Sequence, residues 1–274
     1  MTAVNRPNIL VSNDDGVYAA GITALAAALE AVGDVYVVAP DRERSAVGHA
    51  VTLHRPLRVD RLAARRFAVN GTPSDCVNLA ILGMLPVRPA VVVAGVNAGS
   101  NLGDDVTYSG TVSAAMEGTL LGVPSLAVSL VEGREAADYV PAAEAAARLT
   151  RLLLRDRGRG VSLLNINVPG GPLRGVRITR LGRRVYSEKV VEERDPRGKL
   201  YYWIGAGPPA WEAGEDTDFA AVYAGYISVT PLHLDLTSYE GMKAITGWER
   251  DSRHRGATST GGRGATKRRL VGPH

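Results

Sequence analysis

Short apolar runs alternate with helical patterns along the first 170 residues, and this alternation constrains the fold more than any other feature. The apolar runs lie at 8–13, 34–39, 66–69, 90–94, 125–130 and 162–168. Apolar residues at helical spacing predict helices over 19–31, from the turn at 71–75 through residue 85, over 111–121 and over 136–155. Short strands joined by helices are typical of a parallel sheet that is covered on both faces. The sequence therefore predicts an α/β fold.

The alternation of predicted strands and helices ends after residue 168. Successive strands with no helix between them are predicted at 175–181, 200–205 and 222–230. We therefore expect residues 183–219 to form an antiparallel β arm on the α/β core. An arm too thin to bury its own face usually needs a partner chain. The predicted domains are a catalytic core at 1–170, the β arm and its return to the core at 171–248, and a basic tail at 249–274.

Composition narrows the possible functions. Cys76 is the single cysteine, so an internal disulfide and a cysteine-rich zinc cluster are both excluded. The five histidines have neither HxH nor HExxH spacing, which favours an oxygen-bound metal such as Mg²⁺ or Mn²⁺ over zinc. Much of the net charge of +4 lies after Trp248, among Gly, Ser and Thr, and indicates a disordered tail rather than a specific nucleic-acid interface.

No apolar stretch approaches the roughly 18 residues of a membrane helix, and residues 1–7 are polar and short. We therefore expect no signal peptide and no membrane partner, and a soluble, cytoplasmic protein.

Two adjacent carboxylates, Asp14 and Asp15, follow the first apolar run where a strand gives way to a helix. Two negative charges a few ångströms apart repel each other by about 1 kcal/mol in water, and more strongly in a drier cleft. A divalent cation would remove that repulsion and use both groups as hard oxygen ligands. The alternative is that the pair caps the following helix, as aspartate often does.

Three further loops follow predicted strands. The first, 40–50, contains Ser45 and His49, and the second, 70–76, places Thr72, Ser74 and Asp75 at a helix start. The third, 95–111, is rich in glycine and polar residues and ends in Ser109, Gly110 and Thr111 at the start of a helix. Hydroxyls and unpaired N–H groups at a helix N-terminus are suited to binding a tetrahedral anion.

A metal-binding end and an anion-binding end on one edge of the sheet are what phosphoester hydrolysis requires. Structural roles are open for the same residues. Ser109 and Thr111 could be helix caps, Asn97 and Asn101 turn residues, and Asp104 and Asp105 braces of their loop.

Five segments occur in a characteristic order: 9–16 (ILVSNDDG), 38–45 (VAPDRERS), 70–77 (NGTPSDCV), 95–118 (GVNAGSNLGDDVTYSGTVSAAMEG) and 225–232 (GYISVTPL). Together they resemble the SurE family, the survival-protein 5′-nucleotidases, over about residues 8–240. The basic tail lies outside this resemblance.

The resemblance implies one divalent metal ion per subunit, Mg²⁺ or Mn²⁺, held by Asp14, Asp15, Ser45 and Asn97. It also implies a phosphate pocket made of Asn101, Ser109, Gly110 and Thr111. The fold that it implies is a Rossmann-like, three-layer parallel sheet with a carboxy-terminal β arm exchanged between subunits, in a homodimer or homotetramer.

The implied reaction is hydrolysis of nucleoside 5′-monophosphates to nucleoside and phosphate, with 3′-monophosphates and short polyphosphate as further substrates to test. Asp14, or as second choice Asp15, would orient or deprotonate the attacking water. The nucleotide base is expected over a mouth formed by loops 40–50 and 70–76, near Thr72, Ser74 and His49.

Two other functions remain open: a metal-dependent deacetylase of the HPDD type, and a non-catalytic nucleotide-sensing module. The deacetylase motif has a histidine before its aspartate pair, whereas Asn13 stands here. A haloacid-dehalogenase-like phosphatase needs DxD spacing, which Asp14-Asp15 lacks.

Overall fold

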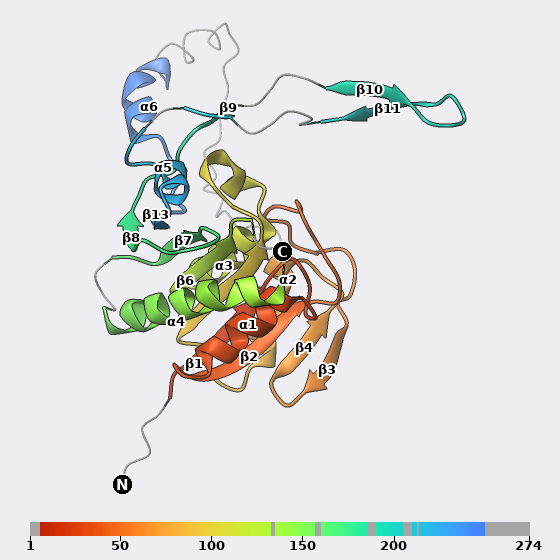
Figure 1. Ribbon diagram of the computed structural model, residues 1–274, viewed down its shortest axis with the longest axis vertical. Coiled ribbons are helices and arrows are strands. Elements are labelled where there is room, and N and C mark those ends of the chain that lie inside the picture. The colour runs from red at the N-terminus through yellow and green to blue at the C-terminus, as the bar shows by residue number, and fades with distance from the viewer. Residues whose placement is uncertain are drawn as a thin grey trace, which may run out of the picture. The chain divides into compact units, whose positions relative to one another are not determined.

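A nine-stranded sheet with mostly parallel strands lies at the centre of the unit Met1–Leu234 (Figure 1). The structure is a computed structural model, and it describes residues 6–132, 135–156, 160–185, 190–204, 210–212 and 214–249. The strand order is β3-β4-β2-β1-β5-β6-β7-β13-β8. The strands are β1 Asn8–Ser12, β2 Asp34–Pro40, β3 Val59–Ala63, β4 Arg66–Val69, β5 Val91–Ala98, β6 Ser125–Leu130, β7 Leu163–Val168, β8 Val176–Ile178 and β13 Ile227–Leu232.

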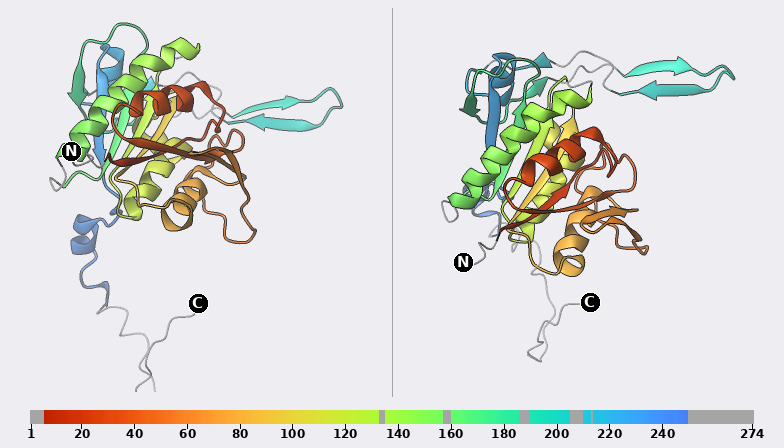
Figure 2. Two further views of the ribbon diagram at one scale, coloured as in Figure 1. Left: turned by 90° about the horizontal axis from the view of Figure 1, so that it is seen from below. Right: turned by 60° about the horizontal axis from the view of Figure 1, so that its bottom comes forward.

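The six strands from β4 to β7 in this order run parallel, and β3 and β13 run antiparallel to β4 and β7. The helices of this unit are α1 Ala20–Leu29, α2 Pro73–Leu79, α3 Gly110–Leu120, α4 Tyr139–Arg155 and α5 Asp218–Tyr223. Short π and 3-10 turns lie at η1 Ala80–Met84, η2 Gly103–Thr107 and η3 Ala136–Asp138. Figures 1 and 2 show α1 and α4 over one face of the sheet and α2 and α3 over the other. The predicted α/β fold with a mostly parallel, three-layer sheet is confirmed.

The alternation of side chains along each buried strand builds two cores. In β1, Ile9 and Val11 pack in the cluster that contains α1 and α4, whereas Leu10 packs in the cluster that contains α2 and α3. Successive side chains of a strand point to opposite faces, so a continuous apolar run serves both layers. Burying one such side chain contributes about 1.5–3 kcal/mol to folding.

Two segments differ from the prediction. Residues 222–230 were expected to be a strand, but α5 runs to Tyr223 and β13 begins only at Ile227. The hydroxyl of Thr217 accepts the Ala220 N–H and caps α5, and Phe219 and Val222 pack beside Leu102 from one face of the helix. Strand β3 was not predicted, because all of its residues are exposed and leave no apolar alternation in the sequence.

The predicted antiparallel extension contains two antiparallel strand pairs. Strand β9 Arg184–Val185 pairs with β12 Ala210–Trp211, and β10 Val191–Arg194 pairs with β11 Leu200–Trp203. Among the described strands, β10 and β11 pair only with each other, and Figures 1 and 2 show them apart from the nine-stranded sheet.

The second unit, Asp235–His274, contains helix α6 Tyr239–Ala244. Apart from its first residue, the tail predicted at 249–274 lies outside the described residues. Strand β13 lies between β7 and β8, so residues after 226 return to the large sheet. The division into domains at 1–170, 171–248 and 249–274 stays a prediction.

Candidate active site

A cleft of about 890 Å³ opens where β1 and β5 end. The four residues of the expected metal site all line this cleft: Asp14, Asp15, Ser45 and Asn97. Asn101 and Ser109 of the expected phosphate pocket line it as well. Clefts at the carboxyl ends of parallel strands are the usual ligand sites of α/β folds. The tertiary structure thus brings together residues from three separate loops.

Asp14 lies against the N-terminus of α3. Its side chain is buried, and the Thr111 hydroxyl donates a hydrogen bond to its Oδ1. A Cβ on Gly110 would lie 2.7 Å from the Asp14 Cβ and 2.8 Å from its Oδ2, so only glycine leaves room for this carboxylate. Burial raises the pKa of Asp14, while the hydrogen bond from Thr111 lowers it.

Asp15 is the second carboxylate of the cleft. Its Oδ2 accepts the Ala98 N–H at 3.2 Å. Burial, followed by repulsion from Asp14, raises the pKa of Asp15 to about 6, although the bond from Ala98 opposes the change; Glu43 adds a smaller repulsion. The two carboxylates therefore resist being charged together unless a cation joins them.

The capping alternative for this pair does not hold. Helix α1 begins at Ala20, its N-cap is Ala19, and no side chain caps it. The loop between β1 and α1 is attached elsewhere, since the Asp14 carbonyl accepts the Arg44 N–H at 2.7 Å. The aspartates therefore face the cleft and do not cap α1.

The donor groups fit a hard divalent ion. Two carboxylates, the Asn97 side-chain oxygen and the Ser45 hydroxyl offer oxygen alone, which suits Mg²⁺ or Mn²⁺ and not zinc. The Ser45 hydroxyl donates to Glu43 Oε1 at 2.6 Å, and its oxygen keeps lone pairs for a cation. Within the described ranges, no group of three or more His, Cys, Asp and Glu side chains could hold a metal, so amide, hydroxyl and water oxygens would have to complete the shell.

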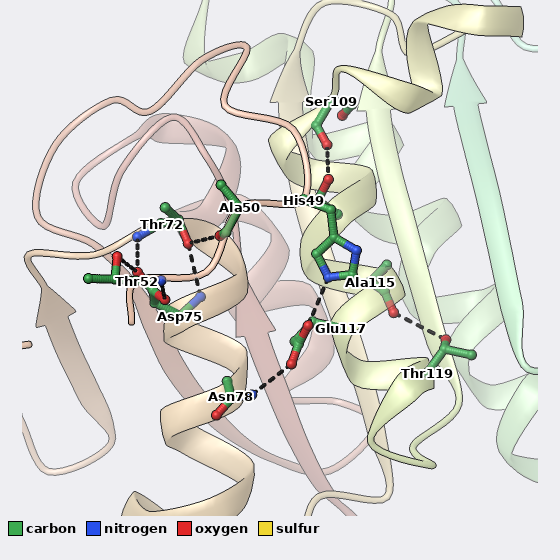
Figure 3. A network of polar contacts seen from close by, with 11 residues as sticks. His49, Ala50, Thr52, Thr72, Asp75, Asn78, Ser109, Ala115, Glu117 and Thr119 are labelled. Carbon is green, nitrogen blue, oxygen red and sulfur yellow. Dashed lines mark hydrogen bonds and ion pairs between the residues drawn. The ribbon is translucent and has the colours of Figure 1, made fainter. Parts of the chain in front are cut away.

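Two buried acids anchor the loop that carries Ser45. Glu117 Oε2 lies 2.8 Å from His49 Nε2, and its Oε1 accepts from the Asn78 amide at 2.7 Å (Figure 3). Asp75 accepts the Thr52 backbone N–H at 2.7 Å and the Thr52 hydroxyl at 2.6 Å. The hydrogen bond from His49 lowers the pKa of Glu117, partly offset by burial.

The expected nucleotide-mouth residues lie near this anchor. The Thr72 hydroxyl donates to the Ala50 carbonyl at 2.7 Å and accepts the Asp75 N–H at 3.1 Å (Figure 3). Ser74 is buried, and His49 faces Glu117. None of the three is among the residues that line the cleft, and their contact with the nucleotide stays a prediction.

Asn101 is held from two neighbouring strands. Its side-chain amide donates to Ser129 at 2.7 Å, and its backbone N–H donates to Asn167 Oδ1 at 2.8 Å. The amides of Asn165 and Asn167 both donate to its carbonyl. Sequence reasoning missed these supporting residues, although two asparagines inside the buried run LLNINV were a usable signal.

Polar residues of the third loop also have the structural roles left open above. Ser109 caps α3, because its Oγ accepts the Val112 N–H at 3.0 Å. Its carbonyl accepts the Ser113 hydroxyl at 2.6 Å. The Asn97 amide donates to the Gly99 carbonyl at 2.9 Å, which leaves its side-chain oxygen for the cleft.

Sequence reasoning also missed Arg184, whose side chain lines the cleft from the base of the β arm. Its Nη1 lies 2.7 Å from each carboxylate oxygen of Asp105, and its backbone N–H donates to Asp104 at 3.1 Å. The second acidic pair therefore braces the arm. No local pattern indicated this pairing.

In the part of the chain that the structure describes, no helix combines the length and the apolar character needed to cross a bilayer.

Comparison with known proteins extends these observations. The family model of the survival protein SurE matches residues 9–188. The 5′-nucleotidase SurE of Syntrophotalea carbinolica is 56% identical over 242 residues, which cover 88% of this chain and 96% of that protein. The corresponding protein of Geobacter sulfurreducens is 57% identical over 246 residues, 88% of this chain and 94% of its own. A crystal structure of the SurE protein from Aquifex aeolicus superposes with a TM-score of 0.79 at 43% identity, covering 89% of this chain and all of that one. Sequence, fold and cleft agree, and the chain belongs to the SurE family.

Proposed function

We propose that this protein is a metal-dependent 5′-nucleotidase that hydrolyses nucleoside 5′-monophosphates to nucleoside and phosphate. The observation that carries the proposal is the contact between a buried carboxylate and the N-terminus of α3, through Thr111 and Gly110. It places a carboxylate ligand for a metal beside a helix N-terminus that can bind an anion, and Ser109 of that N-terminus lines the cleft. Relatives more than 50% identical over most of the chain are named 5′-nucleotidase SurE, which supports the same reaction.

The residues that would hold one Mg²⁺ or Mn²⁺ per subunit are Asp14, Asp15, Ser45 and Asn97. When bound, such an ion polarises the phosphoryl group and lowers the pKa of water. Asp14, or in second place Asp15, orients the attacking water and accepts its proton. Burial keeps competing solvent away from Asp14.

The phosphoryl oxygens are expected to be bound by the backbone N–H groups of Ser109, Gly110 and Thr111 and by the Asn101 amide. Donors fixed in advance stabilise the charge that develops on these oxygens without reorganising during the reaction. Ser129, Asn165 and Asn167 fix Asn101 in this way. The bond between phosphorus and the 5′ oxygen breaks, that oxygen takes up the proton removed from the water, and the nucleoside leaves. Activity on 3′-monophosphates and short polyphosphate is to be tested with the same assay.

We also propose that the protein forms homodimers or homotetramers through an exchanged β arm. Exposed apolar side chains on β11 support this, since Tyr202 is 56% and Trp203 61% exposed. Light scattering should report a mass greater than that of one chain, and the substitution Trp203→Ser should lower the measured mass. A monomeric wild type would refute the proposed oligomer.

A cytoplasmic location is proposed from the single, buried Cys76, because a chain without disulfides suits a reducing compartment.

The activity is tested by phosphate release from AMP with added Mn²⁺, using the wild type, Asp14→Asn and Asp60→Asn. Asp14→Asn should lose at least a hundredfold in kcat while keeping its circular dichroism, because one ligand and the proton acceptor are removed. Asp60 is exposed on β3, outside the cleft, so Asp60→Asn should match the wild type. An Asp14→Asn protein with full activity would refute the mechanism. Turnover of an N-acetyl sugar instead of AMP would favour a deacetylase, and nucleotide binding without turnover a sensing module.

A further inference from the structure

Among the described residues, more carboxylates than basic side chains line the cleft. Four carboxylates line it: Asp14, Asp15, Glu43 and Asp105. A nucleoside monophosphate carries close to two negative charges at neutral pH. Like charges repel each other more strongly in a cleft than in bulk water, because the effective dielectric constant is lower there. One divalent ion at the aspartate pair balances only part of this charge, so a basic side chain beside the substrate would reduce the remaining repulsion.

Arg184 is the one basic side chain among the described residues that line the cleft. Its side chain is 26% exposed, and its Nη1 contacts both oxygens of Asp105 at 2.7 Å. The guanidinium carbon lies 5.5 Å from the centre of the Trp211 ring. A carboxylate and an aromatic ring therefore hold the guanidinium in one orientation at the wall of the cleft.

The base of the β arm is tied to the phosphate-binding loop. Asp218, which is buried, accepts the Gly182 N–H and the Gly103 N–H, each at 2.8 Å. Gly182 lies two residues before Arg184, and Gly103 two residues after Asn101. Arg184 and Asn101 are thus fixed to the same carboxylate through short stretches of backbone.

We propose that Arg184 binds the phosphoryl group of the substrate from the arm side of the cleft; this inference rests on the proposed function. A guanidinium carries five N–H donors, so it can bond a carboxylate and a phosphoryl oxygen together. Asp105 holds it in place, and the charge of Arg184 offsets the repulsion between the substrate and the carboxylates.

Kinetics with AMP and Mn²⁺ test this contact. Arg184 contacts a group that is charged in both ground and transition states, so Arg184→Ala should raise KM roughly 10- to 100-fold and change kcat much less. The KM of Arg184→Lys should lie between those of the wild type and Arg184→Ala, because lysine keeps the charge and loses the planar fork. Inhibition by inorganic phosphate should weaken as KM rises, whereas inhibition by adenosine should not change.

Arg183→Ala is the matched control. Arg183 is next in sequence, but its side chain is 74% exposed, lies 3.6 Å from Glu212 and does not line the cleft. It should have the kinetic constants of the wild type. If Arg183→Ala and Arg184→Ala behave alike, or if Arg184→Ala weakens inhibition by adenosine and not by phosphate, the inference is overturned.

Calorimetric titration of inorganic phosphate into the Mn²⁺-loaded protein tests the same contact without turnover. Phosphate should bind the wild type and Arg183→Ala equally, and Arg184→Ala at least tenfold more weakly. Equal binding by all three, or no binding by the wild type, would overturn the inference. If the wild type binds phosphate through Arg184 but does not hydrolyse AMP, the proposed function fails and this assignment stands. Should Arg184→Ala not fold, Arg184→Lys carries the test, with weaker phosphate binding expected and unchanged binding contradicting the inference.

Discussion

Thr111 donates a hydrogen bond to Asp14, which stands 97 positions earlier in the chain. Gly110 packs against the same carboxylate so closely that an added methyl group would overlap it. At the scale of single residues, the cleft therefore depends on small side chains as much as on charged ones. Adjacent aspartates were a visible sequence signal, while the need for glycine opposite them was not.

Gly110→Ala is expected to displace the Asp14 carboxylate, because the new Cβ would lie under 3 Å from it. We expect kcat with AMP and Mn²⁺ to fall by about two orders of magnitude, since small misplacements in a catalytic site have effects of this size. Gly83→Ala is the control, as a Cβ there meets nothing within 4 Å. Equal activities of the two variants would contradict the close contact.

Glu117→Gln is expected to destabilise the protein in a pH-dependent way. The pKa of Glu117 is lowered from 4.5, chiefly by His49, so the ionised group stabilises the fold above that pH and the effect is lost as the pH falls through the lowered pKa. Urea unfolding should show a loss of about 1–3 kcal/mol at pH 7 and a smaller loss at pH 4. The same loss at both pH values would contradict an ionised Glu117.

At the scale of elements, helix α5 was hidden in the sequence. Its six residues include only three buried apolar side chains, Phe219, Ala221 and Val222, and the apolar strand that follows made the whole segment resemble a strand. Contacts with distant parts of the chain stabilise this helix. Asp218 in its first turn accepts the N–H groups of Gly103, in η2, and of Gly182, in the loop before β9.

Asp218→Asn is expected to lower the free energy of unfolding by about 1–3 kcal/mol, because buried N–H groups lose a charged acceptor. It should also lower activity, since Gly103 adjoins the loop of Asn101. Asp216→Asn is the matched control: its partner Arg180 and its own side chain are largely exposed, so a change within about 0.5 kcal/mol is expected. Urea unfolding of both variants measures the difference, and equal losses would contradict a special role of Asp218.

At the scale of the whole molecule, a bound ion should couple the β1, β2 and β5 loops. Mn²⁺ at a hundred times its dissociation constant should raise the free energy of unfolding by about 2.7 kcal/mol. For a domain of this size that raises Tm by roughly 5–10 °C. Scanning fluorimetry should show the shift in Asp60→Asn and not in Asp14→Asn. An equal shift in both would place the ion away from the aspartate pair.

The periodicity of the sequence by itself determined the α/β class, the order of the central elements and the edge of the sheet where polar loops gather. It could do so because strand and helix each impose a local repeat on apolar residues. The adjacent carboxylates and the polar helix start at Ser109 likewise marked residues that line the cleft. These signals lie in short stretches of neighbouring residues, so they can be recognised from the sequence alone.

Only the tertiary structure decided which distant polar groups meet. His49 faces Glu117 across 68 positions, and Arg184 faces Asp105 across 79. Such contacts depend on how strands are ordered and how loops return over the sheet, and no repeat in the chain records them. A buried ion pair or anchored loop is therefore found only when the elements are in place, because its stability comes from burial and geometry that the folded chain alone creates.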